Sequence, residues 1–263
     1  MAFISVSNRD VEFMRSDNII TPHGFTIRQG GVSKGIFDSL NLGVSLGDDP
    51  ADVRENYRRA MLALEMPLHR LVRSRQVHRD DVLIANESHA IDLYTPIPYE
   101  ADGLITNIPN LPLMVFTADC IPVLLHDPVG GAIGAVHCGW RSTVMDIAGK
   151  AVRMMGESYG SKPENIRAAI GAGISLCCFE TGEDVPTGVR KALGGDKFIF
   201  PKENGKFMVD LKGVVRELLI RSGLTPENID TNPECTVCLH DKYWSHRYTK
   251  GQRGIQSAVI MLR

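Results

Sequence analysis

The sequence predicts an α+β fold in a single domain. Short apolar runs separated by turn signals alternate with segments that have an apolar residue every three or four positions. A helical segment is twice followed by Pro-Glu-Asn-Ile, at residues 163–166 and 226–229, which indicates repeated packing of helix on strand. No linker, low-complexity tract or charge block divides the chain, so we expect one domain over residues 1–263.

The first part of the chain is predicted to provide a glycine-rich loop and one helix. Residues 25–35 contain several glycines, which allow unusual backbone angles and close approach to a ligand, although a surface loop between strands is the simpler explanation. A helix is expected from Pro50, with Asp49 as its N-cap. Its apolar stripe consists of Val53, Tyr57, Met61 and Leu64.

Two short strands are expected next. Leu71–Val77 alternates apolar and polar residues, which predicts a strand that delivers Gln76 and His78 to its end. A single histidine at a strand end is more often structural than a ligand. A prolyl loop at Asp92–Pro98 then precedes a short strand at Ala101–Thr106.

Chemistry is concentrated in the central stretch Leu111–Thr143. Its three apolar runs, at residues 113–116, 123–125 and 132–136, are predicted strands. Polar and reactive residues follow them, and Asp, Cys, His and Arg at strand ends are typical of a catalytic rim. These residues are Asp119, Cys120, His137 and Arg141.

The C-terminal half is predicted to contain two helices, a hairpin and a final strand. One helix follows Arg141, with Val144, Ile147, Ala148, Ala151 and Met155 on one side. The second spans Leu211–Ile220, and the Asn204-Gly205 pair favours a hairpin before it. Ser257–Leu262 is expected to be the last strand.

Composition excludes several classes of protein. The net charge of −2 gives no reason to expect nucleic acid or an anionic membrane as a partner. No run approaches the roughly 18 apolar residues of a membrane span, and residues 1–14 show no basic segment followed by a long apolar stretch, as a signal peptide would, so a cytoplasmic location is expected. Six cysteines without an export signal favour thiols or metal ligands over disulfides.

One candidate metal site consists of His78, Cys120 and His137. Zinc commonly binds cysteine sulfur and histidine nitrogen, and its catalytic sites use three protein ligands with one position open. Each of the three residues ends a predicted strand, so three strands ending at one rim would bring them together.

A rival site lies at Cys235 and Cys238, whose C-x-x-C spacing suits structural zinc or thiol exchange. Either Cys177 with Cys178 or His240 could complete a set of four ligands. Cys138, in contrast, is expected to be a small buried apolar residue.

Two arginines are candidates for binding an anion. Arg141 stands where a helix begins, so its guanidinium and the free N–H groups could hold the same anion. Arg28 lies on the glycine-rich segment. Together with a metal, they suggest a reaction that uses phosphate.

Five motifs resemble the bacterial YfiH-type family, also called the laccase-domain or polyphenol oxidase family. The motifs are TIRQGGVSKGIFDSLNLGVSLGDDP (Thr26–Pro50), RQVH (Arg75–His78), ADGLIT (Ala101–Thr106), TADCIPVLLHD (Thr117–Asp127) and HCGWRS (His137–Ser142). The resemblance implies a metal site at His78, Cys120 and His137. It also implies a single layered α/β domain with mixed β-sheets flanked by helices.

The resemblance further implies a zinc-dependent purine nucleoside phosphorylase that acts on adenosine, inosine and methylthioadenosine and also deaminates adenosine. Arg141 and Arg28 would hold phosphate, while Gln76 and Asn41 would bind the nucleoside. Asp119 would act as general acid or base, or would orient a neighbouring ligand. The chain departs from the family pattern at 138–142, 171–180 and 243–248, which leaves the shape of the pocket open.

Alternatives remain at this stage. The zinc deaminases that use H-x-E with P-C-x-x-C are excluded, because no histidine here is followed two positions later by glutamate. A copper-dependent polyphenol oxidase is disfavoured by only eight histidines and no H-x-H pair, although one copper ion could occupy the zinc site. A hydrolase that edits peptidoglycan precursors, with Cys120 as nucleophile, and a non-enzymatic zinc module complete the set. The oligomeric state is left open.

Overall fold

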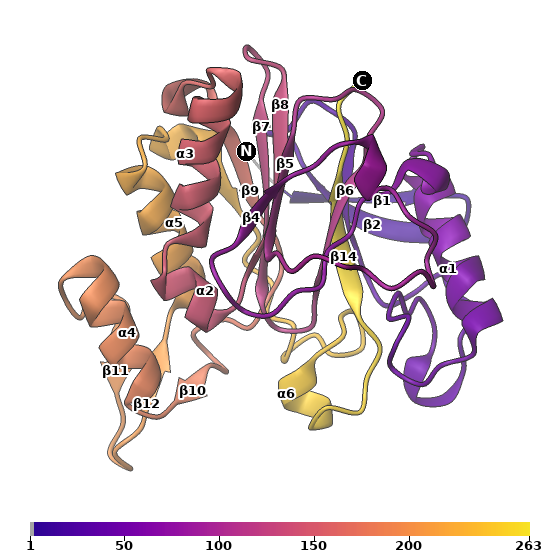
Figure 1. Ribbon diagram of the computed structural model, residues 1–263. Helices are drawn as coiled ribbons and strands as arrows, with labels where there is room; N and C mark the ends of the chain where they lie inside the picture. The colour runs from indigo at the N-terminus through magenta and orange to yellow at the C-terminus, as the bar shows by residue number, and fades with distance from the viewer. Residues whose placement is uncertain (1–2) are drawn as a thin grey trace.

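The computed structural model describes residues 3–263, which form three β-sheets and six α-helices. The helices are α1 (Pro50–Ala63), α2 (Trp140–Val144), α3 (Ile147–Tyr159), α4 (Asp184–Leu193), α5 (Leu211–Arg221) and α6 (His246–Thr249). Figure 1 shows a layered arrangement in which α3 and α5 lie on one side, two sheets follow, and α1 lies on the opposite side. Three clusters of buried apolar side chains fill the spaces between these layers.

The two large sheets differ in strand direction. The antiparallel five-stranded sheet has the order β1 (Phe3–Asn8), β2 (Val11–Ser16), β3 (His23–Thr26), β14 (Gln256–Ile260) and β6 (Leu113–Thr117). The six-stranded sheet has the order β13 (Ile229–Thr231), β9 (Arg167–Ile170), β7 (Ile121–Asp127), β8 (Ala132–Cys138), β5 (Gly103–Thr106) and β4 (Val82–Ile84). Its two edge pairs are parallel and its inner pairs antiparallel, which confirms mixed sheets flanked by helices.

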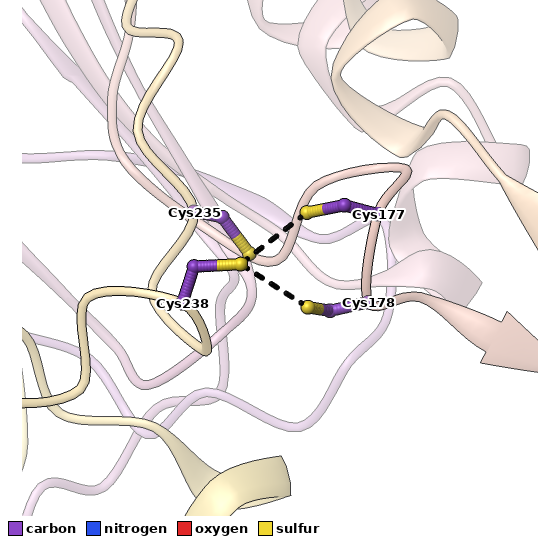
Figure 2. A group of neighbouring side chains, drawn as sticks. All are labelled: Cys177, Cys178, Cys235 and Cys238. Carbon is purple, nitrogen blue, oxygen red and sulfur yellow. Dashed lines mark hydrogen bonds between the residues drawn. The ribbon is translucent and has the colours of Figure 1, made fainter.

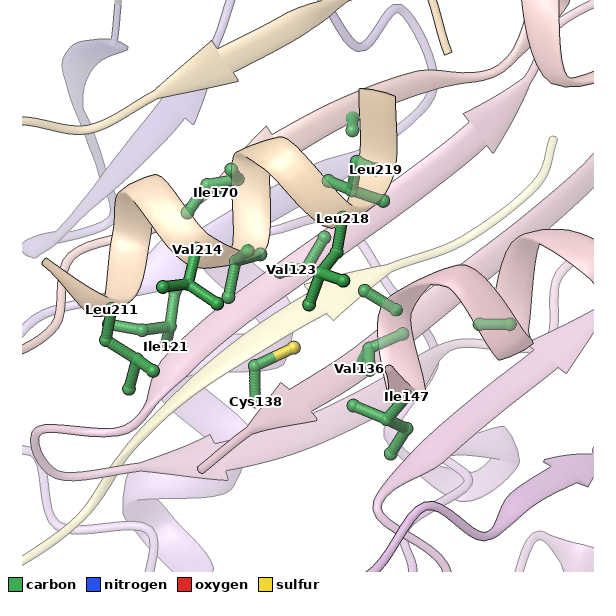
Figure 3. Close-up of a cluster of buried hydrophobic side chains, with 14 of the residues drawn as sticks. Ile121, Val123, Val136, Cys138, Ile147, Ile170, Leu211, Val214, Leu218 and Leu219 are labelled. Atoms are coloured by element: carbon green, nitrogen blue, oxygen red, sulfur yellow. The ribbon is translucent and has the colours of Figure 1, made fainter. Parts of the chain in front are cut away.

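Alternation along β7 explains the layering. Ile121, Val123 and Leu125 belong to the cluster under the helices, whereas Leu124 belongs to the cluster between the sheets. Because successive side chains of a strand point to opposite faces, a continuous apolar run is buried on both sides. Figure 3 shows α5 lying over this strand, with Cys138 among the apolar side chains. The predicted burial of Cys138 is confirmed.

The first helix begins as its sequence predicts. The Ala51 N–H donates to Oδ1 of Asp49 at 2.8 Å, which confirms the N-cap, a contact that contributes about 1 kcal/mol in typical helices. Val53, Tyr57 and Met61 are buried against the five-stranded sheet.

Two of the predicted elements are wrong. Leu71–Val77 forms no strand: Val72 and Arg75 make only isolated bridges to separate segments, so no continuous ladder develops. The helix expected after Arg141 is divided into α2 and α3 at Asp146. This residue has a left-handed backbone (φ 60°), and its carboxylate accepts from the Gly149 N–H, so it caps a new helix.

The later predictions are confirmed. The two Pro-Glu-Asn-Ile segments form 3₁₀ turns that lead into β9 and β13, and these strands are parallel neighbours. A third sheet of β10 (Glu180–Thr181), β12 (Phe207–Val209) and β11 (Ile199–Pro201) contains the hairpin predicted at Asn204-Gly205. No helix in residues 3–263 is long and apolar enough to cross a membrane.

The three central runs are confirmed as β6, β7 and β8, but they do not lie in one sheet. β6 belongs to the five-stranded sheet, and the chain then crosses to β7 in the six-stranded sheet. The crossing consists of Ala118, Asp119 and Cys120. Reactive side chains are therefore placed where the two sheets meet.

Candidate metal centre and active-site pocket

His78, Cys120 and His137 lie together although they are far apart in sequence. One ligand atom from each falls within 4.8 Å of the others. The Cys120 sulfur is 3.9 Å from Nε2 of His78, and the two imidazole rings meet edge to face with centroids 4.8 Å apart. His78 is exposed, Cys120 is half-buried and His137 is buried, so solvent reaches the group from the side of His78.

Different local structures position the three side chains. His137 is the penultimate residue of β8, and Cys120 directly precedes β7. His78 has a left-handed backbone (φ 60°), as has Asp119 before Cys120 (φ 87°). Two ligands thus depend on tight turns, a conformation that costs free energy and persists where surrounding contacts hold it.

One carboxylate, that of the fully buried Asp102, holds two of these ligands. It accepts from Nδ1–H of His137 at 2.7 Å, which leaves Nε2 of that ring for the metal group. It also accepts from the backbone N–H groups of Val77, His78 and Arg79 at 2.9, 3.0 and 3.1 Å. Sequence reasoning missed this role, although an aspartate directly before an apolar strand in ADGLIT was a usable signal.

The charges of the group stabilise one another. Burial raises the pKa of Cys120, but the charge and hydrogen bond of His137, with a contribution from His78, outweigh it and lower that pKa to about 6. Burial lowers the pKa of His137, but Cys120 and Asp102 outweigh it and raise that pKa to about 9. Without a metal ion, these shifts favour a thiolate on Cys120 beside an imidazolium on His137 near neutral pH.

Gly139 leaves space for this group. A Cβ atom at Gly139 would lie 2.8 Å from Cδ2 of His78 and 3.5 Å from the Cys120 sulfur. Its backbone angles suit any residue (φ −69°), so the requirement for glycine is steric. The glycine of the HCGWRS motif is therefore needed because a larger residue would collide with the metal-binding group.

The donor set fits a metal ion. Cysteine thiolate and histidine nitrogen are ligands of zinc, and three protein ligands with a fourth position open are typical of catalytic zinc. A tetrahedral zinc ion needs its sulfur and nitrogen donors roughly 3.3–3.6 Å apart, so donors within 4.8 Å need only small side-chain rotations. His78, Cys120 and His137 would hold the ion, and Asp102 would fix the orientation of His137.

These residues line a pocket of about 810 Å³, within the range of small-molecule sites. The wall includes residues 93–97, which belong to the segment predicted as loop; Leu93 is buried and residues 94–96 are exposed. The apolar part of the wall includes Leu46, Phe116, Trp140, Ile174 and Phe179.

Two arginine side chains of the C-terminal segment also line this pocket. Arg253 is half-buried, and its Nε atom has no hydrogen-bond partner within residues 3–263. Burial lowers the pKa of Arg253, and the nearby charges of Asp119 and Cys120 oppose this effect. Arg247 also lines the pocket. Neither arginine is among the candidates from the sequence, although Arg247 lies in the segment 243–248 that was compared with the family pattern.

The structure shows what the other candidate residues contact. Both carboxylate oxygens of Asp119 accept hydrogen bonds at 2.6 Å, one from the Thr236 hydroxyl and one from the backbone N–H of Arg247. Gln76 lines the pocket, but its amide group pairs with the backbone N–H and C=O of Phe116.

Three candidates lie outside the pocket lining. Asn41 is buried and hydrogen-bonds Asp48, Gly43 and Ile255. Arg28 donates to the carbonyl groups of Asp38 and His240 and stacks on Trp244. Arg141 is exposed, with its guanidinium 4.3 Å from the ring centre of Trp140, which does line the pocket.

Comparison with known proteins identifies the family. The family described as multi-copper polyphenol oxidoreductase laccase matches residues 22–263. A Deinococcus radiodurans protein named purine nucleoside phosphorylase is 38% identical over 95% of this chain and 92% of its own length. The crystal structure of YlmD from Geobacillus stearothermophilus superposes with a TM-score of 0.92 at 31% identity, covering 100% of both chains. That of the Bacillus licheniformis hypothetical protein YfiH gives 0.91 at 32% identity, covering 99% of both. The chain belongs to this family of YfiH-type laccase-domain proteins.

Proposed function

We propose that this chain is a zinc-dependent purine nucleoside phosphorylase that also deaminates adenosine. The observation that carries the proposal is that three metal-binding side chains and the unpaired Nε of Arg253 line one pocket. Relatives named purine nucleoside phosphorylase, which this chain matches over most of its length, support the same conclusion.

The metal site supports zinc. His78, Cys120 and His137 supply nitrogen, sulfur and nitrogen, and no fourth side chain of residues 3–263 joins their group. Zinc bound there would supply Lewis acidity at the position that the protein leaves open. Asp102 accepts a hydrogen bond from Nδ1–H of His137, so Nε2 of that ring would be the atom free to hold the ion.

The pocket supports a purine nucleoside as substrate. Phe116, Trp140 and Phe179 offer flat apolar surfaces, and aromatic rings stack favourably on planar bases. The volume of about 810 Å³ is sufficient for a nucleoside together with phosphate. Adenosine, inosine and methylthioadenosine are the proposed substrates.

Two arginines of the pocket lining, Arg73 and Arg253, have an Nε atom without a hydrogen-bond partner within residues 3–263. The guanidinium group of Arg73 already donates to two backbone carbonyl groups of the 92–93 segment, so Arg253 is better placed to bind phosphate. A buried guanidinium N–H without a partner costs free energy, and an anionic ligand would satisfy it. Arg141 and Arg28 remain candidates from the sequence, but their guanidinium groups already contact Trp140 or backbone carbonyl groups. We assign phosphate to Arg253; Arg247 also lines the pocket, but its guanidinium group donates to two backbone carbonyl groups.

Asp119 acts as a positioning residue in this proposal. With both oxygens accepting hydrogen bonds, it holds the segment that contains Thr236 and Arg247 against the metal group. Gln76 and Asn41 likewise stabilise the backbone around the pocket.

The proposal is tested by incubating purified protein with adenosine, inosine or methylthioadenosine, with and without phosphate. Phosphate-dependent release of the base, together with ammonia from adenosine, is expected. Arg253→Ala should raise the KM for phosphate more than the KM for the nucleoside. Release of base that does not depend on phosphate would contradict the phosphorylase assignment.

A copper-dependent polyphenol oxidase is a second candidate, because two histidines and one cysteine also suit copper. Against it, no methionine lines the pocket as a weak fourth ligand, and the two possible metal groups of residues 3–263 contain only two histidines. Oxidation of a phenol by the copper-loaded but not the zinc-loaded protein would favour this candidate.

A cysteine hydrolase that edits peptidoglycan precursors is the third candidate. Cys120, His137 and Asp102 form a thiolate, imidazolium and carboxylate series like that of cysteine hydrolases. A metal ion and a free nucleophile cannot use the same sulfur. Removing metal with a chelator should therefore abolish phosphorolysis but activate hydrolysis of a muropeptide precursor, if that activity exists.

A further inference from the structure

Four cysteines outside the pocket come together from two distant segments. Cys177 and Cys178 lie in the turn before β10, and Cys235 and Cys238 lie after β13. All four sulfur atoms fall within 4.8 Å of one another. Figure 2 shows the two pairs pointing toward a common centre from opposite sides.

The spacing of the sulfur atoms suits one tetrahedral ion. The Cys238 sulfur is 3.6 Å from that of Cys177 and 3.4 Å from that of Cys178. Four thiolates around one zinc ion, each about 2.3 Å from it, lie roughly 3.8 Å apart. The four thiols are free, and four sulfurs converging on one point exceed what a single disulfide needs.

We propose that Cys177, Cys178, Cys235 and Cys238 bind a second zinc ion, which is structural. Four protein ligands leave no position open for substrate, which distinguishes this centre from the one in the pocket. His240 is not a member of the group, because its ring stacks on Tyr248 with centroids 3.5 Å apart.

Polar groups beside Cys235 favour a thiolate at that position. The Ser175 N–H points to the Cys235 sulfur at 3.4 Å, as backbone amides do around bound thiolates. The Lys212 ammonium group is buried and donates to the carbonyl groups of Asn232 and Glu234, just before Cys235. This buried positive charge would offset part of the negative charge of four thiolates and one zinc ion.

The second zinc ion would join two walls of the pocket. The segment around Gly173 pairs with Cys235, and the Thr236 N–H donates to the Gly173 carbonyl. From the two joined segments, Ile174, Phe179 and Arg247 line the pocket. Arg247 also donates to the carbonyl groups of Cys178 and Glu180, and so links both segments directly.

The test is the zinc content of protein purified without chelator and under reducing conditions. We expect two zinc ions per chain in the wild type, one in Cys238→Ser, one in Cys120→Ser and none in the double variant. Cys138→Ala is the matched control, since Cys138 is buried but belongs to neither group, and it should retain both ions.

Each departure from this pattern has a distinct meaning. One zinc ion in the wild type that is lost in Cys120→Ser but kept in Cys238→Ser would overturn the inference and leave the proposed function intact. Two ions in the wild type, of which Cys238→Ser removes one and Cys120→Ser none, would support the inference and contradict the zinc site in the pocket.

A measurement on the wild type covers the case in which Cys238→Ser does not fold. Exposed Cys177 and Cys238 should resist alkylation in the native protein and become reactive when a strong chelator removes zinc. Spectra of the cobalt-substituted protein should show thiolate-to-metal absorption from four sulfurs at one ion. Disulfides among the four cysteines in reduced, chelator-free protein, or alkylation that is unaffected by the chelator, would overturn the inference.

Discussion

The two sulfur-containing groups of this chain differ in donors, burial and surroundings. The pocket group has one sulfur and two nitrogens, backed by the buried carboxylate of Asp102. The second group has four sulfurs and joins two loops, with two of its cysteines exposed. Three donors at the wall of a cavity leave an ion accessible to substrate, whereas four donors surround it.

The difference teaches that cysteine count alone does not identify a reactive site. Partner charges lower the pKa of Cys120 to about 6. Burial and the neighbouring thiol of Cys238 instead raise the pKa of Cys177 to about 11. The imidazole neighbours of Cys120 make its thiol acidic. In the second group, burial raises the pKa of Cys235, but backbone N–H groups, including that of Ser175, outweigh it and lower that pKa to about 7.

The largest expected effect is the loss of activity in Cys120→Ala. Removing a metal ligand should reduce kcat/KM for phosphorolysis by about 10³-fold or more, because Lewis-acid catalysis is worth several kcal/mol. Zinc content should fall by one ion per chain, measured on the same sample. Full activity in this variant would show that the pocket group is not the reactive centre.

The second prediction compares how the alkylation of a cysteine in each group depends on pH. In metal-free protein, alkylation of Cys120 should be half-maximal near pH 6, because the thiol loses its proton as the pH rises through its lowered pKa. Cys177 should reach its half-maximum only near pH 11. Mass spectrometry of samples alkylated at several pH values measures both.

His137→Ala provides the control for that difference. Without the imidazolium, the pH at which alkylation of Cys120 is half-maximal should rise toward the usual pKa range of cysteine. Burial, which raises the pKa, is then no longer opposed by this charge. If the pH of half-maximal alkylation did not change, His137 would not be stabilising the thiolate.

The third prediction concerns Asp102→Asn. The amide keeps the size of the side chain but loses the charge that orients Nδ1–H of His137, so zinc affinity or activity should fall about 10- to 100-fold. Competition with a zinc chelator measures the affinity. The second group should keep its zinc in this variant, and loss of both ions would indicate general unfolding instead.

The fourth prediction concerns the space beside the pocket group. Gly139→Ala should weaken zinc binding about 10-fold, because the new Cβ would lie 2.8 Å from the His78 ring and displace it. Gly195→Ala is the matched control, since nothing lies within 4 Å of its Cβ position. Equal effects of the two substitutions would contradict the steric argument.

The smallest effect on catalysis is expected in Cys238→Ser. This variant should retain measurable phosphorolysis while its Tm falls by several degrees, because a structural ion stabilises the fold without contacting substrate. Cys120→Ala retains only the ion of the second group, so its chelator treatment should lower its Tm by a similar amount. A loss of activity as complete as in Cys120→Ala, with unchanged Tm, would reverse the roles of the two groups.

Much of the fold could be predicted from local sequence. The cap at Asp49, the hairpin at Asn204-Gly205 and the strands of the central stretch depend on neighbouring residues, and all three are confirmed. The failures at Leu71–Val77 and Asp146 arose because distant partners and a left-handed backbone override periodicity.

The site was only partly predictable for the same reason. His78, Cys120 and His137 were found from their motifs, and the structure brings them together. The roles of Asp102 and Arg253 depend on contacts between residues far apart in sequence, which no spacing reveals. Arg141 and Asn41, in contrast, stand in strong motifs but lie outside the pocket lining.

The central claim is that a zinc ion in the pocket group supports phosphorolysis. It is tested most directly by measuring phosphate-dependent base release from inosine and adenosine with zinc-loaded, chelator-treated and zinc-restored protein, alongside Cys120→Ala. We predict activity in the loaded protein, its loss with the chelator, its recovery on adding zinc, and none in the variant. Equal turnover in all four samples, or turnover that does not depend on phosphate, would contradict the account.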